Sequence, residues 1–164
     1  MPTKPLSIRG VAHPPPQRRG GRANQADLTR AEIDTTNLAG KPLLCEHDHG
    51  DRVGTVLASW QGRDGSLRIA ANVESASAIA AVRRGEMRGL SLGTAMTLDG
   101  NGNVAYRGQE ELSICEEGKR PGTWIDTMDG RACHTVACFS KSAAGARTHA
   151  LGALEMIWFG LGRK

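Results

Sequence analysis

Two short apolar runs separated by a glycine-containing turn constrain the fold of this chain more than any other feature. Residues 52–60 (RVGTVLASW) and 66–73 (SLRIAANV) are rich in apolar and β-branched residues, and residues 61–65 (QGRDG) separate them. Gly and Asp favour tight turns, because Gly adopts positive φ freely and Asp hydrogen-bonds to its own backbone. The pattern therefore predicts a β-hairpin over 52–73.

More short runs of the same kind follow the hairpin. Strands are predicted at 89–98, 103–108, 110–115 and 134–139, with a turn at 99–103 (DGNGN). Helices are predicted at 75–87, where an alanine-rich stretch ends in a basic pair, and in the apolar tail at 150–161. The expected fold class is mainly β with helices (α+β).

The chain length favours a single domain. With 164 residues the chain is long enough for one substantial core and too short for a second large domain, so 1–164 is expected to form one unit. Residues 10–25 (GVAHPPPQRRGGRANQ) combine Pro, Gly and Arg with little to bury. This composition predicts a flexible surface loop.

Composition also argues against several classes of protein. No apolar run approaches the ~20 residues that a membrane-spanning helix needs, and the amino end is not a signal-type apolar segment. The four cysteines are irregularly spaced, which favours reduced thiols in a protein that stays inside a cell. The net charge of +4 is spread along a chain with six aromatic residues, so no nucleic-acid interface is expected.

Ser91 is the first candidate for chemistry. In residues 89–94 (GLSLGT), strand alternation places Leu90 and Leu92 on one face and Ser91 with Gly93 on the other. A serine hydroxyl is a poor nucleophile until a base removes its proton and a third group orients that base. Taken alone, the pattern favours a small strand residue, so a catalytic role depends on finding a base.

The chain has five histidines, of which His47 is the best candidate for that base. It lies where an apolar run meets a turn in 42–54 (PLLCEHDHGDRVG), a common place for a functional side chain. His49 is two residues away and is its nearest rival. His13, in the Pro-rich segment, and His149, near the tail, are interpreted as solvated surface residues.

Three sequence blocks, taken in order, resemble the herpesvirus assemblins, which are capsid-maturation serine proteases. Residues 43–65 resemble the first signature, and residues 89–94 resemble the nucleophile motif, which the prohead proteases of tailed phages share in looser form. Residues 111–123 (ELSICEEGKRPGT) resemble the third signature, His-Val-Ala-Leu-Cys followed by Gly-Arg-Arg-x-Gly-Thr. The resemblance spans roughly 42–125. It implies a closed β-barrel core flanked by helices.

The resemblance also implies a role for each site residue. Ser91 matches the nucleophile and His47 the general base, while Glu111 stands where the herpesvirus enzymes have a second histidine. A carboxylate there would accept the ring N–H of the base and stabilise the imidazolium. Lys119 and Arg120 match the two residues that stabilise the oxyanion, the first through its backbone N–H and the second through a water.

Two residues compete with Glu111 for the third position. Because Leu112 and Ile114 occupy the core face of the expected strand, alternation places Glu111 on the opposite face and disfavours Glu110. His134 also begins a strand-like run that ends in Cys and would restore a His-Ser-His set. It lacks a following Gly-Lys-Arg block and is ranked second.

The cysteines and histidines raise two other chemistries, a metal site and a cysteine nucleophile. A zinc site would draw on Cys45, His47, His49, Cys133, His134 and Cys138, but their spacings differ from the usual C-x2-4-C and H-x3-5-H pairs. Metal is therefore not expected. A cysteine nucleophile, Cys45 or Cys115 working with His47, is an alternative enzyme that thiol alkylation distinguishes from a serine enzyme.

The function that the resemblance implies is a serine endopeptidase that cleaves scaffold and shell proteins during viral capsid (prohead) maturation. No cofactor is expected. The expected partner is a viral scaffold or capsid polypeptide inside the infected host cell, with self-cleavage near Ala143 and Ala144 and a homodimer as further predictions. The contrasting hypothesis is a non-catalytic, scaffold-associated structural protein of the same fold.

Overall fold

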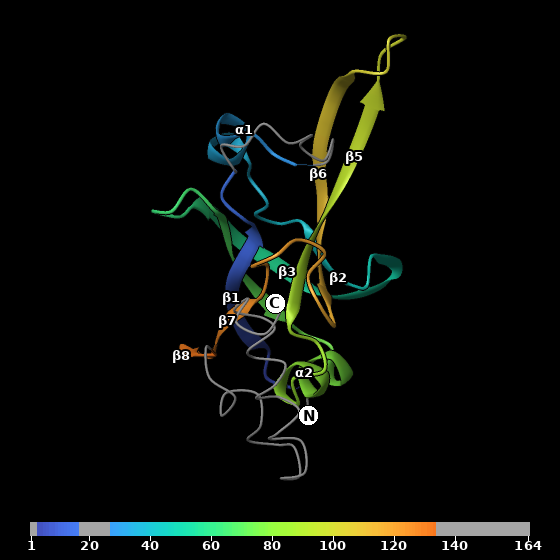
Figure 1. Cartoon of the computed structure of the whole chain (residues 1–164). Helices are drawn as coiled ribbons and strands as arrows, with labels where there is room; N and C mark the ends of the chain where they lie inside the picture. The colour runs from blue at the N-terminus through green and yellow to red at the C-terminus, as the bar shows by residue number, and fades with distance from the viewer. Residues whose placement is uncertain (1–2, 17–26, 134–164) are drawn as a thin grey trace, which may run out of the picture.

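The computed structural model of the chain describes residues 3–16 and 27–133. In this part, eight strands form one sheet in the order β5-β6-β2-β3-β4-β1-β7-β8 (Figure 1). The strands are β1 (Leu6–His13), β2 (Pro42–Cys45), β3 (Asp48–Gln61), β4 (Leu67–Val73), β5 (Gly89–Leu98), β6 (Val104–Cys115), β7 (Ile125–Met128) and β8 (Arg131–Ala132). The helices are α1 (Arg30–Thr35) and α2 (Ala76–Arg83). The predicted fold class, mainly β with few helices, is confirmed. The strand predicted at 134–139 and the helix predicted at 150–161 lie outside the described residues.

The predicted hairpin over 52–73 is confirmed as β3 and β4. The two strands pair antiparallel, with Val56 opposite Ala71. The Asp64 carboxylate closes the turn between them, because it accepts hydrogen bonds from both the backbone N–H and the hydroxyl of Ser66. Gly65 has a φ of 88°, a conformation that glycine adopts without steric cost. The turn residues that the sequence analysis identified therefore act as expected.

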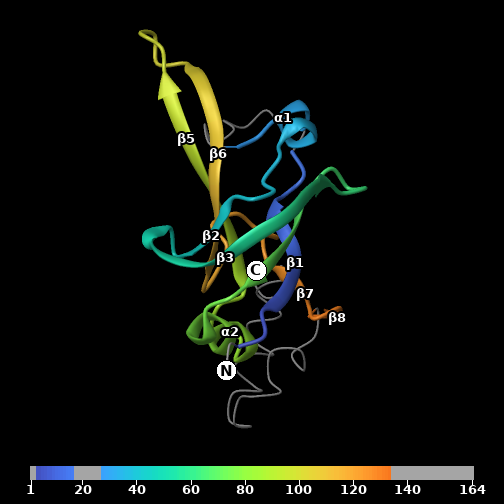
Figure 2. The ribbon, with the colours of Figure 1, turned by 180° about the vertical axis from the view of Figure 1, so that it is seen from behind.

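Strands β5 and β6 form a long antiparallel arm that projects beyond the rest of the sheet (Figures 1 and 2). The separate runs predicted at 103–108 and 110–115 are one continuous strand. They looked separate because a β-bulge interrupts the alternation: Gly93 pairs with Glu111, whereas the next residue, Thr94, pairs with Gln109. Glu110 is the extra residue at this bulge.

Strand β2 joins the hairpin to the arm. It pairs antiparallel with β3 and parallel with β6, where Leu43 lies beside Leu112 and Cys45 beside Ile114. The other strand pairs in the described part of the sheet are antiparallel. The parallel pairing places the turn that follows β2 next to the carboxyl end of β6.

The core lies along alternate residues of β1 and β4 and under both helices. Leu6 and Ile8 of β1 and Ile69 of β4 are fully or almost fully buried, and α2 adds Val82 while α1 adds Ile33. Burying a side chain of this size contributes about 1.5–3 kcal/mol. The helices lie apart, with α1 beside the middle of β6 and α2 towards the other end of the molecule, near the start of β5 (Figure 1). Within 3–16 and 27–133, no helix has the length and apolar character to cross a bilayer.

The predicted closed barrel is not confirmed. The strand pairing gives an open order with β5 and β8 at its two ends. The sheet curls far enough for an isolated bridge to form between Gly89, at the start of β5, and Trp124, just before β7. The Leu90 N–H also donates to the Thr123 carbonyl oxygen at 3.2 Å. These contacts join the two sides locally without a continuous ladder.

The flexible loop predicted over 10–25 is wrong in its first residues, because 10–13 belong to β1 and pair with β4 and β7. Residues 17–26 lie outside the described part. His13 is buried, with 2% of its surface exposed, and is not the solvated residue that was expected. Its Nδ1 bonds to the Pro14 carbonyl oxygen, and its Nε2 accepts from the Leu28 N–H. The prolines that follow obscured the strand alternation of 6–13.

Candidate active site

His47 lies in a two-residue turn between β2 and β3. Cys45 pairs with Asp48, and the two residues between them, Glu46 and His47, have φ values of 48° and 62°. Positive φ at both central residues is the conformation of a type I′ hairpin turn, which normally contains Asn or Gly. Non-glycine residues held in this region cost of order 1–3 kcal/mol each and concentrate at functional sites.

Strand β6 and the residue just beyond it hold this turn in place. The Glu46 N–H donates to the Ile114 carbonyl oxygen at 3.0 Å, and Glu46 Oε1 accepts from the Glu116 N–H at 2.8 Å. The His47 N–H donates to Ser113 Oγ at 3.0 Å. These bonds fix both turn residues and leave the imidazole facing the β5–β6 ladder.

The face of β5 and β6 that His47 meets carries four small or polar residues. Ser91 lies opposite Ser113 in the ladder, and Gly93 lies opposite Glu111. The two leucines that flank Ser91 belong to the hydrophobic core, as strand alternation predicted. Ser91 itself is only 5% exposed.

The imidazole of His47 connects Ser91 to Glu111. Nε2 lies 2.8 Å from Ser91 Oγ, and Nδ1 makes a short hydrogen bond to Glu111 Oε1. An ionised carboxylate only accepts, so Nδ1 carries the proton and Nε2 is left to accept from the Ser91 hydroxyl. The Glu111 side chain is 3% exposed, whereas that of His47 is 41% exposed. The structure therefore brings together the three residues that the sequence pointed to.

Two rival residues, His49 and Glu110, are placed away from the imidazole of His47 and from Ser91. His49 is exposed on β3, and Glu110 is exposed at the bulge of β6. His134 lies outside the described residues, and Glu111 occupies the position beside His47 Nδ1 that it would need. The alternation of side chains along β6 correctly distinguished Glu111 from its neighbour Glu110.

Ser113 was missed by the sequence analysis as a site residue. Its hydroxyl is completely buried, donates to Glu111 Oε2 at 2.9 Å and accepts from the His47 N–H. The signal was present, because the alternation that selected Glu111 places Ser113 on the same face two residues later.

Known proteins were compared with this chain by sequence and by structure. No protein-family model matches it, and no curated protein matches it. Solved structures do match. The protease of Kaposi's sarcoma-associated herpesvirus (KSHV), in complex with a hexapeptide phosphonate inhibitor, aligns with a TM-score of 0.59 and 16% identity over 90% of this chain and 74% of that chain. The varicella-zoster virus protease aligns with a TM-score of 0.51 and 13% identity over 98% of this chain and 80% of that chain.

This chain has the assemblin fold. A further KSHV protease structure, in complex with a dimer disruptor, has a TM-score of 0.51 and 18% identity over 90% of this chain and 88% of that chain. At such identities the likeness concerns the fold. The expectation of an assemblin-like architecture is thus confirmed, and the roles of the site residues are argued from their geometry.

Within the assemblin fold, Lys119 and Arg120 lie in the loop that follows β6. This loop packs directly on the start of β5: a Cβ atom on Gly89 would lie 2.1 Å from the backbone nitrogen of Gly118. Lys119 is the next residue, so its backbone is close to the strand that carries the nucleophile candidate. The Arg120 side chain is 12% exposed, and its Nε donates to Asp27 Oδ1 at 2.8 Å.

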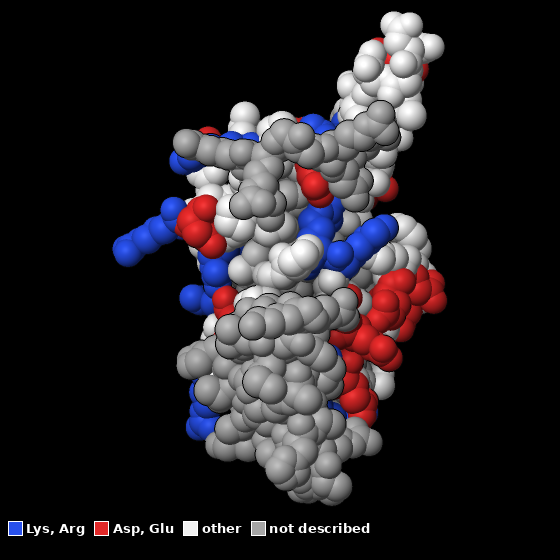
Figure 3. Space-filling model, viewed as in Figure 1, with Lys and Arg blue, Asp and Glu red and all other residues white. Residues whose placement is uncertain are grey.

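The thiols near the site are poorly suited to act as nucleophiles. Burial, reinforced by the charge of Glu46, raises the pKa of the Cys115 thiol to about 12. Burial and the carboxylate of Asp51 also raise the pKa of Cys45. Figure 3 shows Asp and Glu side chains gathered on the side of the molecule where β2 and β3 meet. In this acidic surrounding the reactive thiolate is rare at neutral pH, which argues against the cysteine alternative.

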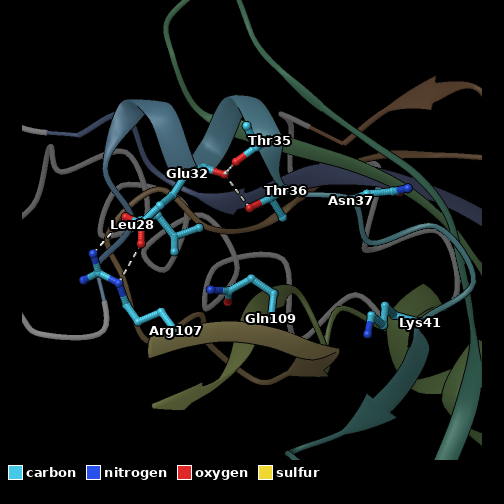
Figure 4. Close-up of a pocket in the computed structure, with 8 residues that line it drawn as sticks. All are labelled: Leu28, Glu32, Thr35, Thr36, Asn37, Lys41, Arg107 and Gln109. Carbon is cyan, nitrogen blue, oxygen red and sulfur yellow. Dashed lines mark hydrogen bonds and ion pairs between the residues drawn. The ribbon is translucent and has the colours of Figure 1, made fainter. Parts of the chain in front are cut away.

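A pocket in the described part of the chain lies outside the site. A polar pocket of about 270 Å³ lies between α1 and β6, where Arg107 Nη2 pairs with Glu32 Oε2 at 2.8 Å (Figure 4). Its lining includes none of the predicted site residues.

Within 3–16 and 27–133, no group of three or more His, Cys, Asp or Glu side chains is arranged to hold a metal ion.

Proposed function

We propose that this protein is a serine endopeptidase in which Ser91 is the nucleophile, His47 the general base and Glu111 the residue that orients the base. One observation carries the proposal: the His47 ring uses Nε2 to contact Ser91 Oγ and Nδ1 to contact Glu111 Oε1. This is the chain of contacts that serine activation requires, and unrelated folds have reached it independently. The assemblin fold supports the proposal by analogy.

The chemistry follows from the protonation states of the three groups. Ser91 Oγ attacks the scissile carbonyl carbon while His47 Nε2 takes the hydroxyl proton. The buried carboxylate of Glu111 stabilises the imidazolium that forms. Nε2–H then donates its proton to the leaving amine, the C–N bond breaks, and an acyl-enzyme remains on Ser91. A water molecule, deprotonated by His47, hydrolyses the acyl-enzyme by the reverse sequence.

The loop after β6 supplies the oxyanion stabilisation in this proposal. The Lys119 N–H donates to the developing negative oxygen, and Arg120 acts on it through a water. Two contacts support this role: the loop packs against the first residues of β5, and the ion pair with Asp27 holds Arg120 in place before substrate arrives. Preorganised donors of this kind stabilise a transition state without reorganising during the reaction.

The proposed substrates are scaffold and shell polypeptides of an assembling virus capsid inside an infected cell, with self-cleavage as a related reaction. Support comes from the fold that this chain shares with two herpesvirus proteases, one of which binds a hexapeptide phosphonate inhibitor. A homodimer belongs to the same proposal, since the related KSHV protease binds a dimer disruptor. Sedimentation of the active protein tests the dimer, and a fully active monomer would remove it.

Labelling with a fluorophosphonate probe, which reacts with activated serines, tests the catalytic assignment. We expect the wild-type protein to be labelled and Ser91→Ala to lose all labelling. Ser7→Ala is the matched control, because Ser7 is exposed on β1 and its backbone bonds join it to Asp129, outside the proposed site. A Ser91→Ala variant that is labelled like the wild type would contradict the assignment. Wild-type protein that is folded but unlabelled would favour the non-catalytic structural alternative.

A further inference from the structure

The hydroxyl of Ser113 both donates and accepts a hydrogen bond inside the site. As a donor it bonds to Glu111 Oε2 at 2.9 Å, and as an acceptor it receives the His47 backbone N–H at 3.0 Å. No surface of Ser113 is exposed. A single buried atom, Ser113 Oγ, therefore contacts both His47, the proposed base, and Glu111, the carboxylate proposed to orient it.

The hydrogen bond that Ser113 donates pairs an oxygen of the Glu111 carboxylate that would otherwise be buried without a partner. Glu111 has two oxygens, and His47 Nδ1 uses Oε1. With the side chain 3% exposed, Oε2 needs a donor from the protein, because an unpaired oxygen of a buried carboxylate is costly. Ser113 supplies that donor. With both oxygens held, the carboxylate cannot rotate away from the imidazole.

The hydrogen bond that Ser113 accepts stabilises the backbone of the turn that carries His47. His47 has a φ of 62°, and its N–H points at β6 instead of into the β2–β3 ladder. An acceptor at that point stabilises a backbone conformation that a histidine would otherwise leave. Ser113 thus fixes the ring both through its backbone and through its hydrogen-bond partner.

Two of the departures of this chain from the third signature fall on these positions, whereas those at Leu112, Ile114 and Lys119 exchange residues of similar chemistry. Glu111 stands in place of the histidine, and Ser113 in place of the alanine. A carboxylate brings a second acceptor oxygen that a histidine does not have, and a hydroxyl two residues later on the same face is the shortest way to pair it. The two changes are chemically complementary.

We propose that Ser113 is a positioning residue for the peptidase reaction, which holds Glu111 and His47 in the geometry that activates Ser91. The inference rests on the proposed function of the site. Ser113 itself does not touch the reacting atoms in this proposal.

Steady-state kinetics of Ser113→Ala on a peptide substrate test the role. We expect kcat to fall about tenfold to a hundredfold and KM to change less than about twofold, because the loss affects base orientation and not substrate binding. Ser66→Ala is the matched control: Ser66 is also fully buried and donates to a carboxylate two residues earlier, Asp64, at a different turn. Its kcat should equal that of the wild type. An unchanged kcat in Ser113→Ala would overturn the proposal.

A double-mutant cycle separates positioning from general destabilisation. In a Glu111→Ala background Ser113 keeps only its bond from the His47 N–H, so adding Ser113→Ala should lower the residual kcat by a clearly smaller factor than it does in the wild-type background. An equal loss in both backgrounds would mean that Ser113 acts independently of Glu111, and the proposal would fail. Melting temperatures of all variants establish that each is folded under the assay conditions.

Nitrogen-15 NMR of the histidine rings gives a readout that does not depend on activity. In the wild type we expect a single His47 tautomer with the proton on Nδ1, and in Ser113→Ala a mixture of tautomers. If the mixture appears but the wild type does not react with the fluorophosphonate probe, Ser113 has its positioning role and the peptidase function is wrong. If the tautomer is the same in both proteins, the positioning role is wrong whatever the activity.

Discussion

Ser91 Oγ and His47 Nε2 lie 2.8 Å apart, although the two residues are separated by 44 positions in the chain. The contact depends on two parts of the structure. The β5–β6 ladder holds Ser91, and the β2–β3 turn, fastened to β6, holds His47. Because Glu111 and Ser113 also lie on β6, one strand positions the base in three ways: through its orienting carboxylate, through a buried hydroxyl and through the backbone of its carboxyl end.

Replacing Glu111 with Gln tests the third member of the set. The amide keeps the shape of the side chain but not the negative charge that stabilises the imidazolium, so we expect kcat to fall by about 10³-fold. The comparison variant is His134→Ala, which should retain kcat within about twofold. Should His134→Ala be the damaging change and Glu111→Gln the mild one, the assignment of Glu111 would be wrong.

Gly93→Ala should act on the same carboxylate from across the ladder. A Cβ atom at this position would lie 1.9 Å from Glu111 Oε1, so the carboxylate must move away from His47. We expect kcat to drop about a hundredfold, since small displacements of a catalytic group have effects of that size. Gly100→Ala, whose new methyl would meet nothing within 4 Å, serves as the control. Equal activity of the two variants would show that the Glu111 carboxylate is not held tightly.

The two proposed oxyanion residues should respond differently to truncation. Lys119 acts through its backbone, so Lys119→Ala should keep kcat/KM within about threefold. Arg120 acts through its side chain, and Arg120→Ala should lower kcat/KM by about a hundredfold. Arg83→Ala removes an exposed cation at the end of α2 and controls for the loss of positive charge. A strong effect of Lys119→Ala together with a weak effect of Arg120→Ala would reverse the proposed roles.

Burial lowers the pKa of His13, which makes stability depend on pH. Below about pH 6.5 the unfolded chain binds a proton that the folded chain does not, so the free energy of unfolding decreases as the pH falls through this range. Urea unfolding at pH 7.5 and pH 5.5 measures the effect. His13→Gln should lose less stability between these pH values than the wild type does, with a difference of up to about 1.4 kcal/mol per pH unit. Equal losses would mean that His13 titrates normally.

Local patterns predicted the parts of the fold that local chemistry determines. The β3–β4 hairpin follows from the turn residues Asp64 and Gly65, and α2 from an alanine-rich stretch. Alternation along β5 and β6 was also sufficient to place Ser91 and Glu111 on faces opposite the core leucines. These predictions needed no knowledge of distant residues.

Several contacts between distant residues escaped prediction. The parallel pairing of β2 with β6 has no local signal, because nothing in residues 42–45 indicates which strand will lie beside them. The buried His13 was misassigned because its partner, the Leu28 N–H, lies 15 residues away beyond a Pro-rich segment. Ser113 was overlooked for a different reason: a small polar residue in a strand has a role only once its neighbours in space are known.

The pairing of β2 with β6 also determines when the site can exist. The bond from the His47 N–H to Ser113 spans 66 residues, and closing a loop of this size is among the slower steps of folding. Until β6 is in place, Ser91 has no base beside it. Under the proposed function, a copy that is still being synthesised, or one that has stalled partway through folding, therefore carries its serine in an inert form. In that proposal, peptide cleavage becomes available only to molecules whose folding has reached this pairing.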